Sequence, residues 1–492
     1  MNSEKIVSIN PATKEVIGSV QVNTIESLDT VFKQARTGAD EWSRLRLTQR
    51  ARKIRLVRKN LVAHLDELSA LIAAETGKTH WDGFLEVFTT VEHMRHVGRR
   101  GPEYLRTELR SSGLLINKKC YVNYNPHGVV GVISPWNYPL ILTASPVIEA
   151  LMAGNAVVLK PSEFTPLTCQ LMTNLFHEAG IPDNVLQTIY GYGDIGAELV
   201  KNSQTDMICF TGSVEVGKKI ASACADNLKP VVLELGGKDP MIVLEDANLK
   251  RAAGAAVWGG FSNCGQTCIS VERIYVVENV ADEFINLVKT MTDSLTTGHD
   301  KDLDDIGALV NKQQQEKVLG QIKEAMVSGA KTFSGGEDLS TLGGYFIKPV
   351  VLEVHDDQSD IMQKETFGPE ICIMRVKNEE EAIERANSTG YGLSASVFTK
   401  KKKHGQLIAR KIRSGSVCVN DVITNYIIPD LPFGGVGISG IGRVHGQEGL
   451  RSFSQVQAVL VDRFGMKKEP WWYPLNQFIQ SIFRGFTKLF YG

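Results

Sequence analysis

The sequence predicts an α/β protein with two lobes, on two observations. Short apolar runs of four to six residues alternate with helical stretches between residues 145 and 290, and the alternation resumes from about 305 to 425. Each run ends where a cluster of glycine, proline or serine begins, which is typical of βαβ units and a parallel sheet. At 492 residues the chain is too long for one ordinary core, so we expect two or three domains.

The expected elements follow in order along the chain. Residues 25–110 are predicted to be helical because apolar residues recur there three and four positions apart. A strand-like segment, LLINKKCYVNYNPHGVVGVIS, occupies residues 114–134. The expected strands after it are AVVLK (156–160), LQTIY (186–190), MICF (207–210), PVVLEL (230–235), ICIMRV (371–376), SASVFT (394–399) and SVCVN (416–420).

The composition is that of a soluble globular protein, with 43% hydrophobic residues, 22% charged residues and a net charge of −1. A net charge near zero gives no electrostatic basis for binding nucleic acid, so we expect no nucleic-acid partner. The N-terminal stretch is polar and unlike a signal peptide, and no apolar run reaches about 18 residues. We therefore expect a cytoplasmic protein whose eight cysteines are reduced.

Three turns are candidates for binding a dinucleotide. GYGDIG (191–196) fits the G-x-G-x-x-G pattern, but no acidic residue closes a second strand about 20 residues later, so we interpret it as a structural turn. In FTGSVEVG (210–217), a strand runs into a helix whose first N–H groups can bind an anion. In VLKPSEFTP (158–166), the Glu163 carboxylate can accept from ribose hydroxyls and would repel a 2′-phosphate.

Four separated stretches contain residues that suit nucleophilic catalysis. They are GVISPWNYP (131–139), LELGGKDP (233–240), FSNCGQTCIS (261–270) and ETFGPE (365–370). A thiol nucleophile needs a base, oxyanion donors and space for an acceptor, and Cys, Glu and Asn can supply these parts. Spacing alone does not show that the stretches converge. For Cys264 and Cys268, four residues apart, a metal clip, a disulfide, a nucleophile beside a bystander and two buried thiols all stay open.

Eight motifs occur together and in order, namely GVISPWNYP, VLKPSE, FTGSVEVG, LELGGK, FSNCGQTC, ETFGP, YGLSASVFT (391–399) and PFGGVGISGIGRVHGQEG (432–449). On these motifs the chain resembles the aldehyde dehydrogenase superfamily over roughly residues 5–462. The resemblance implies a Rossmann-type cofactor domain, an α/β catalytic domain and a small β oligomerisation element. It also implies oxidation of an aldehyde to a carboxylic acid through a cysteine thiohemiacetal and a thioester, with NAD as cofactor and NADP as the alternative.

The same resemblance implies a role for each matching residue. Cys268 is the expected nucleophile, Asn137 the amide that holds the oxyanion together with the Cys268 N–H, and Glu234 the general base. Cys264 is then expected to be a buried thiol. The presence of Glu234 favours hydrolysis over transfer to coenzyme A, and no metal is expected because the histidines supply no further ligands beside the two cysteines. The expected cofactor-binding residues are Ser134, Trp136, Lys160, Ser162, Glu163, Gly212, Ser213, Val216, Glu365 and Phe367.

The resemblance also divides the chain. An NAD-binding domain is expected over residues 1–106 and 126–235, and a catalytic domain over 236–448. An oligomerisation element is expected over 107–125 and 449–463, which makes a homodimer or a homotetramer the expected assembly.

The expected substrate is a hydrophobic aldehyde, with a long-chain, isoprenoid or aromatic body. Members of the superfamily often carry a bulky aromatic residue where Ser145 stands here, which suggests a wider or longer substrate channel. A short semialdehyde, such as succinate semialdehyde, is the alternative substrate. A non-catalytic binding protein on the same fold is the alternative from another class.

The tail over residues 464–492 lies beyond the resemblance and contains nine aromatic residues. From residue 475 on, its apolar residues recur on one face of a helix, with basic residues largely off that face. A helix of this kind suits a membrane interface, so residues 471–492 are expected to allow peripheral membrane contact at the cytoplasmic face. Packing on the same subunit, packing on a partner subunit and a lid over the substrate channel are the alternatives.

Overall fold

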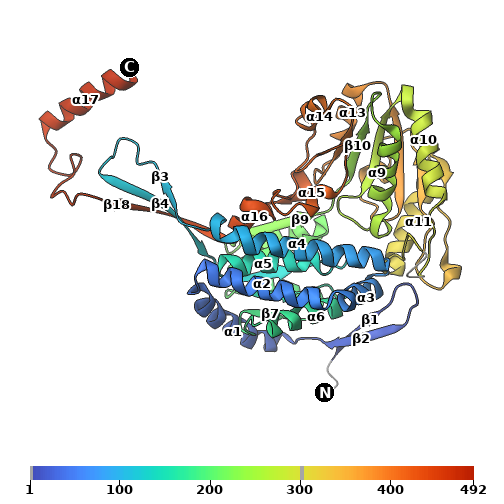
Figure 1. Cartoon of the computed structure of the whole chain (residues 1–492), viewed down its shortest axis with the longest axis horizontal. Coiled ribbons are helices and arrows are strands. Elements are labelled where there is room, and N and C mark those ends of the chain that lie inside the picture. The colour runs from blue at the N-terminus through green and yellow to red at the C-terminus, as the bar shows by residue number, and fades with distance from the viewer. Residues whose placement is uncertain (1–3, 300–303) are drawn as a thin grey trace. The chain divides into compact units, whose positions relative to one another are not determined.

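The computed structural model describes residues 4–299 and 304–492 and divides into two compact units (Figure 1). The larger unit runs to Leu105 and resumes over Asn125–Gln455, and the smaller unit consists of Arg106–Tyr124 and Val456–Gly492. The larger unit contains two mixed sheets with helices packed on them, which confirms the predicted α/β fold with two lobes.

One sheet of the larger unit is six-stranded and almost entirely parallel. Its strands are β5 (Val129–Ile133), β6 (Ala156–Lys160), β7 (Leu186–Thr188), β8 (Met207–Gly212), β9 (Val231–Leu235) and β17 (Gly440–Ile441). Their order is β17-β9-β8-β5-β6-β7, and only the β17–β9 pair is antiparallel. The predicted parallel pairing of the apolar runs is therefore confirmed, whereas β17 comes from a distant segment that local patterning did not identify.

Helices from the first half of the chain accompany this sheet, together with an N-terminal hairpin of β1 (Lys5–Ile9) and β2 (Val16–Gln21). The helices are α1 (Ile25–Ser43), α2 (Leu47–Ala63), α3 (Leu65–Thr76), α4 (His80–Tyr104), α5 (Ile141–Ala153), α6 (Pro166–Glu178), α7 (Gly193–Lys201) and α8 (Val214–Ala225). Every residue of α5 is buried, because α4 and α2 pack against it. The predicted helical region extended to about 110, but α4 ends at Tyr104 and residues 108–110 form a strand.

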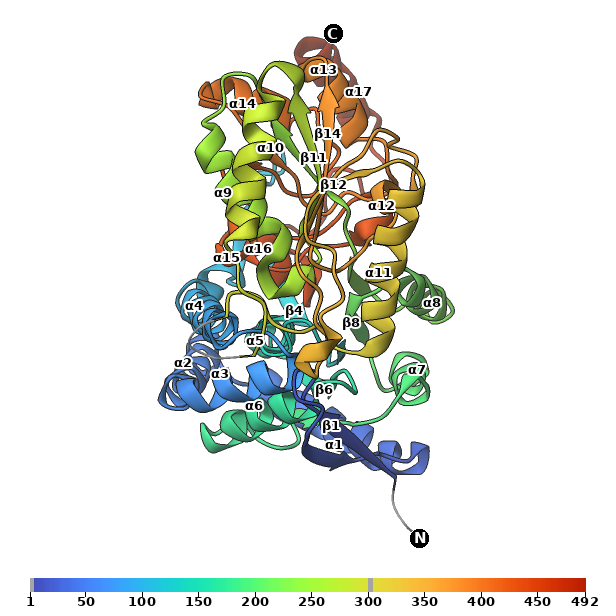
Figure 2. The same ribbon diagram turned by 90° about the vertical axis from the view of Figure 1, so that its right-hand side faces the viewer.

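The other sheet of the larger unit is seven-stranded. Its strands are β10 (Asp239–Val243), β11 (Val271–Val277), β12 (Lys331–Ser334), β13 (Val350–Glu353), β14 (Glu370–Val376), β15 (Ser396–Phe398) and β16 (Cys418–Val419). Their order is β12-β13-β14-β11-β10-β15-β16, with only β12 antiparallel to its neighbour. Figure 2 shows β11, β12 and β14 in one lobe and β6 and β8 in the other.

Helices cover the seven-stranded sheet, with α9 and α10 packed together against it. The helices in the second half of the chain are α9 (Leu249–Phe261), α10 (Glu278–Asp293), α11 (Lys312–Val327), α12 (Asp360–Gln363), α13 (Glu379–Ala386), α14 (Lys402–Ala409), α15 (Thr424–Ile427) and α16 (Gly446–Ser452). Of these, α16 packs on α4 and α5 of the other lobe. Short 3₁₀ turns occur at η1 (Ser262–Gly265), η2 (Ser340–Leu342) and η3 (Gly437–Ser439).

The smaller unit contains a three-stranded sheet in the order β18-β4-β3, followed by a helix. Its elements are β3 (Glu108–Arg110), β4 (Lys118–Pro126), β18 (Ser454–Asp462) and α17 (Gln477–Tyr491). The Lys118 ammonium bridges the Asp462 carboxylate at 2.8 Å and the Glu469 carboxylate, which ties the start of the tail to β4.

In the part of the chain that the structure describes, no helix is both long enough and apolar enough to cross a membrane.

The carboxyl ends of the parallel strands carry the predicted site residues. Ser134, Trp136 and Asn137 follow β5, Lys160 ends β6, and Ser213 follows β8. In open α/β sheets, ligands bind in the crevice outside these strand ends, so the topology alone brings the motifs together. The predicted limits of the cofactor-binding, catalytic and oligomerisation domains stay predictions.

Candidate active site

The two cysteines of FSNCGQTCIS lie in different environments. Helix α9 ends at Phe261, and Asn263 and Cys264 adopt left-handed φ angles of 53° and 56°. This turn breaks the helix, so the two thiols do not share a helical face. Cys264 is 1% exposed and packs in the core of the seven-stranded lobe, whereas Cys268 lies half-buried in a cavity.

A carboxyl group faces the Cys268 thiol. The Cys268 Sγ lies 3.6 Å from Oε1 of Glu234, which projects from β9 and is buried. Burial raises the pKa of Glu234 to about 7. Burial, together with the negative charges of Glu234, Asp239 and Glu365, also raises the pKa of Cys268 well above its usual value. The thiol therefore needs a base to remove its proton, and Glu234 is placed to be that base.

The Asn137 side chain connects the β5–α5 turn to the loop of Cys268. Its Nδ2 donates to the backbone carbonyl of Gln266 at 3.0 Å, two residues before Cys268. Asn137 is 4% exposed and lines one cavity together with Cys268 and Glu234. A carboxamide has two N–H groups, so the second one can donate to an oxyanion in that cavity.

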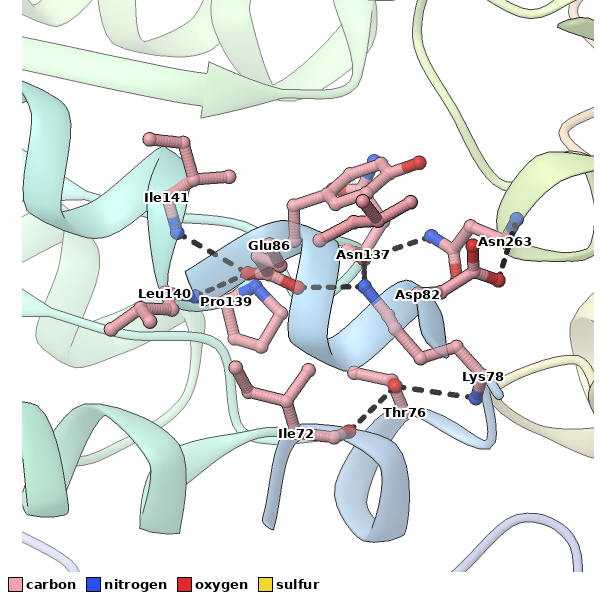
Figure 3. A network of polar contacts seen from close by, with 12 residues as sticks. Ile72, Thr76, Lys78, Asp82, Glu86, Asn137, Pro139, Leu140, Ile141 and Asn263 are labelled. Carbon is pink, nitrogen blue, oxygen red and sulfur yellow. Dashed lines mark hydrogen bonds and ion pairs between the residues drawn. The ribbon is translucent and has the colours of Figure 1, made fainter. Parts of the chain in front are cut away.

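Two further side chains hold the backbone carbonyl of Asn137 (Figure 3). Lys78 donates from Nζ at 2.8 Å and Asn263 donates from Nδ2 at 2.9 Å. The Asn263 amide also donates to the carbonyl of Gln266 at 3.1 Å, so it bridges both loops. Neither residue was predicted, because a lysine after a glycine and an asparagine in a turn are both common at surfaces.

Lys78 is paired with a buried carboxylate that reaches the other side of the same turn. Its Nζ lies 2.8 Å from Oε2 of Glu86 on α4, and both side chains are fully buried. Oε1 of Glu86 accepts from the backbone N–H groups of Leu140 at 2.7 Å and Ile141 at 3.2 Å, at the start of α5 (Figure 3). The sequence signal for Glu86 was a charge among the apolar positions of its helix.

The cavity that contains Cys268 collects most of the predicted site residues. It is lined by Trp136, Asn137, Gly212, Ser213, Glu234, Cys268, Glu365 and Phe367, among others. Ser213 also begins α8 as its N-cap, accepting at Oγ from the Val216 N–H at 3.4 Å. The five remaining predicted residues lie outside the lining of this cavity. Lys160 and Glu163 are 3.9 Å apart after β6, Ser162 is buried beside them, Ser134 accepts from Thr143 at 2.8 Å, and Val216 is exposed on α8.

A second buried lysine organises the loop of Glu365 and Phe367. Lys238 pairs with the carboxylates of Glu272 and Glu370, and Glu272 accepts from the Thr366 and Phe367 N–H groups at 3.0 Å each. Phe367 is held at a φ of 60°, with its ring 5.5 Å from that of Trp136 in an edge-on arrangement. Burial also raises the pKa of Glu365 to about 7. Motif spacing did not identify these anchors.

An apolar pocket reaches Cys268 from another direction. Its lining is Asp82, Leu85, Glu86, Thr89, Tyr138, Ile141, Leu142, Trp258, Ser262, Thr267, Cys268, Ile269, Ile423, Tyr426 and Ile427. Within the described chain, this lining has two carboxylates and no lysine, arginine or histidine. Ser145 is buried in α5 and does not line the pocket, so the predicted effect of Ser145 on channel width has no direct basis in the lining.

GYGDIG serves as a turn at the start of α7. A Cβ on Gly191 would lie 2.3 Å from Cγ1 of Ile195, so glycine allows the loop to pack on this side chain. In residues 4–299 and 304–492, no group of three or more His, Cys, Asp or Glu side chains is placed to hold a metal ion.

The fold brings a thiol, a carboxyl and an amide to one cavity, and the chain belongs to the aldehyde dehydrogenase family, whose model matches residues 1–459. It is 36% identical, over 99% of its length and 91% of the relative's, to 4,4'-diapolycopene aldehyde oxidase of a Methylomonas species. It is 37% identical to a candidate succinate-semialdehyde dehydrogenase, named for NADP, of Mycobacterium ulcerans, over 92% and 87% of the two chains. The solved structure of an NAD-dependent aldehyde dehydrogenase from Sinorhizobium meliloti superposes with a TM-score of 0.91 at 32% identity, covering 95% of this chain and 93% of that one.

Gly265→Ala is predicted to destabilise the protein, because Gly265 seats the loop of Cys268 against the loop of Glu365. Its φ is +70°, and a Cβ there would lie 1.9 Å from the Gly368 carbonyl oxygen. The left-handed backbone alone costs about 1–2 kcal/mol for a residue with a Cβ, and the clash adds to it. Thermal unfolding measures the loss. The matched control is Gly320→Ala on α11, where a Cβ meets open space and alanine should raise the melting temperature. Equal stability of Gly265→Ala and the wild-type protein would contradict this account.

Proposed function

We propose that this chain oxidises hydrophobic aldehydes to carboxylic acids, with NAD as hydride acceptor and Cys268 as nucleophile. The observation that carries the proposal is the convergence at Cys268. Its thiol faces the Glu234 carboxyl, shares a cavity with the Asn137 amide, and also lines an apolar pocket that can hold the body of a substrate.

The first step is formation of a thiohemiacetal. Glu234 takes the thiol proton of Cys268, Sγ bonds to the aldehyde carbon, and the carbonyl electron pair moves to oxygen. The second N–H of Asn137 and the Cys268 N–H stabilise the resulting oxyanion. Removing one such donor typically lowers the rate by about 10²–10³-fold.

The second step removes hydride from the same carbon. NAD supplies the hydride acceptor when it is bound. As hydride leaves, the carbonyl of the substrate forms again and the carbon stays bonded to Sγ as a thioester. Asn137 and Cys268 then keep that carbonyl oxygen oriented for the next attack.

The third step is hydrolysis. Glu234 first releases to solvent the proton that it took from the Cys268 thiol. It then accepts a proton from water, the oxygen of which bonds to the thioester carbon, and the C–S bond breaks to return the Cys268 thiolate. One aldehyde, one NAD and one water thus give one carboxylate, one NADH and two protons.

The residues of the cavity that Cys268 shares with Glu234 and Asn137 fit a nicotinamide dinucleotide. Glu365 suits the nicotinamide ribose, Phe367 and Trp136 would border the ring, and the N-terminus of α8 at Ser213 suits a diphosphate. Lys160 and Glu163 form a pair at the end of β6 that suits the adenosine ribose, and the carboxylate disfavours a 2′-phosphate. Similar proteins named for NAD and for NADP support NAD as the main cofactor with NADP as the alternative.

The pocket chemistry favours a neutral, hydrophobic aldehyde over a short dicarboxylic semialdehyde. A carboxylate at the far end of a substrate would need a cation, and the described lining offers only Asp82 and Glu86 as charged groups. Glu86 is already paired with Lys78. Of the two similar proteins, the one named for a long polyene aldehyde fits this lining better than the one named for succinate semialdehyde.

NADH formation with saturated aldehydes from three to twenty carbons tests the substrate class. Because each buried methylene contributes about 0.8 kcal/mol, kcat/KM should rise by up to about fourfold per methylene until the pocket is filled. Succinate semialdehyde should be the poorer substrate, and added coenzyme A should not raise the rate. A preference for succinate semialdehyde over decanal would contradict the hydrophobic assignment, and absence of NADH with every aldehyde would support a non-catalytic protein.

The pH dependence of kcat/KM should show an acid limb near pH 7. The pKa of Glu234 is raised to about 7, and only its carboxylate accepts a proton, so activity rises as pH increases through that value. Below it, activity should fall about tenfold per pH unit. Glu234→Gln should remove this limb together with most of the turnover. The same limb in Glu234→Gln would show that another group titrates.

For the assembly, we propose a cytoplasmic homodimer or homotetramer that uses β3, β4 and β18. These strands form a small sheet with exposed residues on β18, which can extend pairing to a second copy. Common oligomeric assembly in this family supports the proposal.

For the tail, we propose contact with an anionic membrane surface. The basic side chains Lys467, Lys468, Arg484 and Lys488 accompany a single acidic one, Glu469, which is engaged with Lys118. The tail exposes a large apolar area, made by Trp471, Trp472, Tyr473, Leu475, Phe478, Ile482, Phe483, Leu489, Phe490 and Tyr491. An amphipathic basic helix with aromatic anchors suits anionic lipid.

Deleting residues 471–492 should abolish sedimentation with phosphatidylglycerol vesicles, because it removes the exposed aromatic helix and keeps the Lys118–Glu469 pair. Turnover of a short aldehyde such as hexanal should stay unchanged. Full-length protein with phosphatidylcholine vesicles is the charge control, and Gln480→Ser is the matched helix control. Equal sedimentation of the truncated and full-length proteins would contradict membrane contact through the tail.

A further inference from the structure

We propose that Lys78 and Glu86 are positioning residues for the oxyanion donor Asn137. The inference rests on the proposed function, because it concerns how the chain places the amide that stabilises the thiohemiacetal. Neither residue bonds to substrate in this account. They act through the turn between β5 and α5.

The Lys78 ammonium has a partner for each of its three N–H directions. It donates to Oε2 of Glu86 at 2.8 Å and to the carbonyl of Asn137 at 2.8 Å, and it lies 4.1 Å from the centre of the Tyr138 ring. With its side chain fully buried, the ammonium has no water to exchange with. An ammonium without an alternative partner keeps the Asn137 carbonyl in one place.

Glu86 holds the opposite side of the turn. Its Oε1 accepts from the N–H groups of Leu140 and Ile141, which lie at the start of α5 and have no partner within that helix. The ion pair therefore holds the backbone at two points that follow the Asn137 side chain, namely the Asn137 carbonyl and the start of α5. Figure 3 shows the two side chains reaching this turn from the α3–α4 connection and from α4.

The Asn137 amide is consequently fixed from two directions. Its own backbone is held by Lys78 and Asn263, and its Nδ2 is held by the carbonyl of Gln266, next to the Cys268 loop. A displacement of about 1 Å in a positioned catalytic group can cost about 10²-fold in rate. The pair thus sets the distance between oxyanion donor and nucleophile.

A buried ion pair is a costly way to stabilise a fold. Taking both charges out of water costs several kcal/mol per ion, and apolar replacements of similar volume are often as stable. The Lys78–Glu86 pair does supply directional hydrogen bonds to the backbone, which an apolar pair cannot supply. This difference separates a positioning role from a purely structural one.

The test compares Lys78→Met with the double variant Lys78→Met/Glu86→Gln, using the full chain with NAD and decanal. Lys78→Met leaves a buried carboxylate unpaired, which destabilises the fold, whereas the double variant buries no charge and keeps an amide oxygen for the Leu140 and Ile141 N–H groups. The double variant should therefore recover the wild-type melting temperature. Its kcat should stay about 10–100-fold below wild type, with KM for decanal changed by less than about threefold.

Two readouts separate positioning from general damage. Alkylation of Cys268 by iodoacetamide needs no oxyanion donor, so its rate should match wild type in the double variant. The second readout adds Lys78→Met and Glu86→Gln to the variant Asn137→Ala. The triple variant should have a kcat less than about twofold below that of Asn137→Ala alone, because the effects of residues that act through one group do not add.

Wild-type kcat in the stable double variant, or full additivity with Asn137→Ala, would overturn the positioning role. Either result would leave the proposed reaction standing, provided that Asn137→Ala itself is crippled. Near-normal turnover of Asn137→Ala would instead overturn the role of that amide in the proposed reaction, and the positioning role with it.

Discussion

The hydrogen bond from the Asn137 side chain to the Gln266 carbonyl joins the two loops on which the site depends. One loop follows β5 in the six-stranded sheet, and the other precedes β11 in the seven-stranded sheet. Because neither loop pairs with a strand of the other sheet, buried contacts must fix their separation. The bond is buried, and Asn263 reinforces it by donating to a carbonyl of each loop. Nucleophile and oxyanion donor are therefore parts of one connected unit.

Two buried lysine–carboxylate pairs hold loops of the site in the same way. Lys78 with Glu86 holds the turn of Asn137, and Lys238 with Glu272 holds the loop of Phe367. In each case a fully buried lysine fixes a carboxylate, and the carboxylate accepts backbone N–H groups of a functional loop. Such charge-assisted hydrogen bonds are shorter and stronger than neutral ones, and a low-dielectric interior makes breaking them expensive. Loops that would otherwise be mobile can thus hold a cavity open between two sheets.

Much of the fold and the reactive groups could be predicted from the sequence, because local patterns determine them. Apolar runs such as AVVLK and MICF form parallel strands, as predicted. The motifs also identified Cys268 and Glu234, and the fold brings these two side chains face to face. Features that depend on distant pairing could not be predicted in this way. The strand β17 acquires its partner β9 only through tertiary contact, and the spacing of Cys264 and Cys268 gave no sign that a left-handed turn separates them.

The anchoring residues were missed for a related reason. Lys78 and Lys238 look like ordinary charged residues in sequence, and only the folded chain shows that no water reaches them. The supporting carboxylates come from segments far from the loops they hold, as Glu86 does for Leu140 and Glu272 does for Thr366. Sequence motifs identify the residues that react. The residues that position them can be recognised only from the contacts they make in the folded chain.

The central claim is that the aldehyde carbon becomes bonded to Cys268 and waits there for water activated by Glu234. The most direct measurement is rapid-quench peptide mass spectrometry of the wild-type protein during its first turnover of decanal with NAD. The account predicts NADH together with a transient decanoyl mass on the peptide that contains Cys264 and Cys268, lost in Cys268→Ala and kept in Cys264→Ala. NADH release without any acyl adduct, or an adduct that survives loss of Cys268, would contradict it.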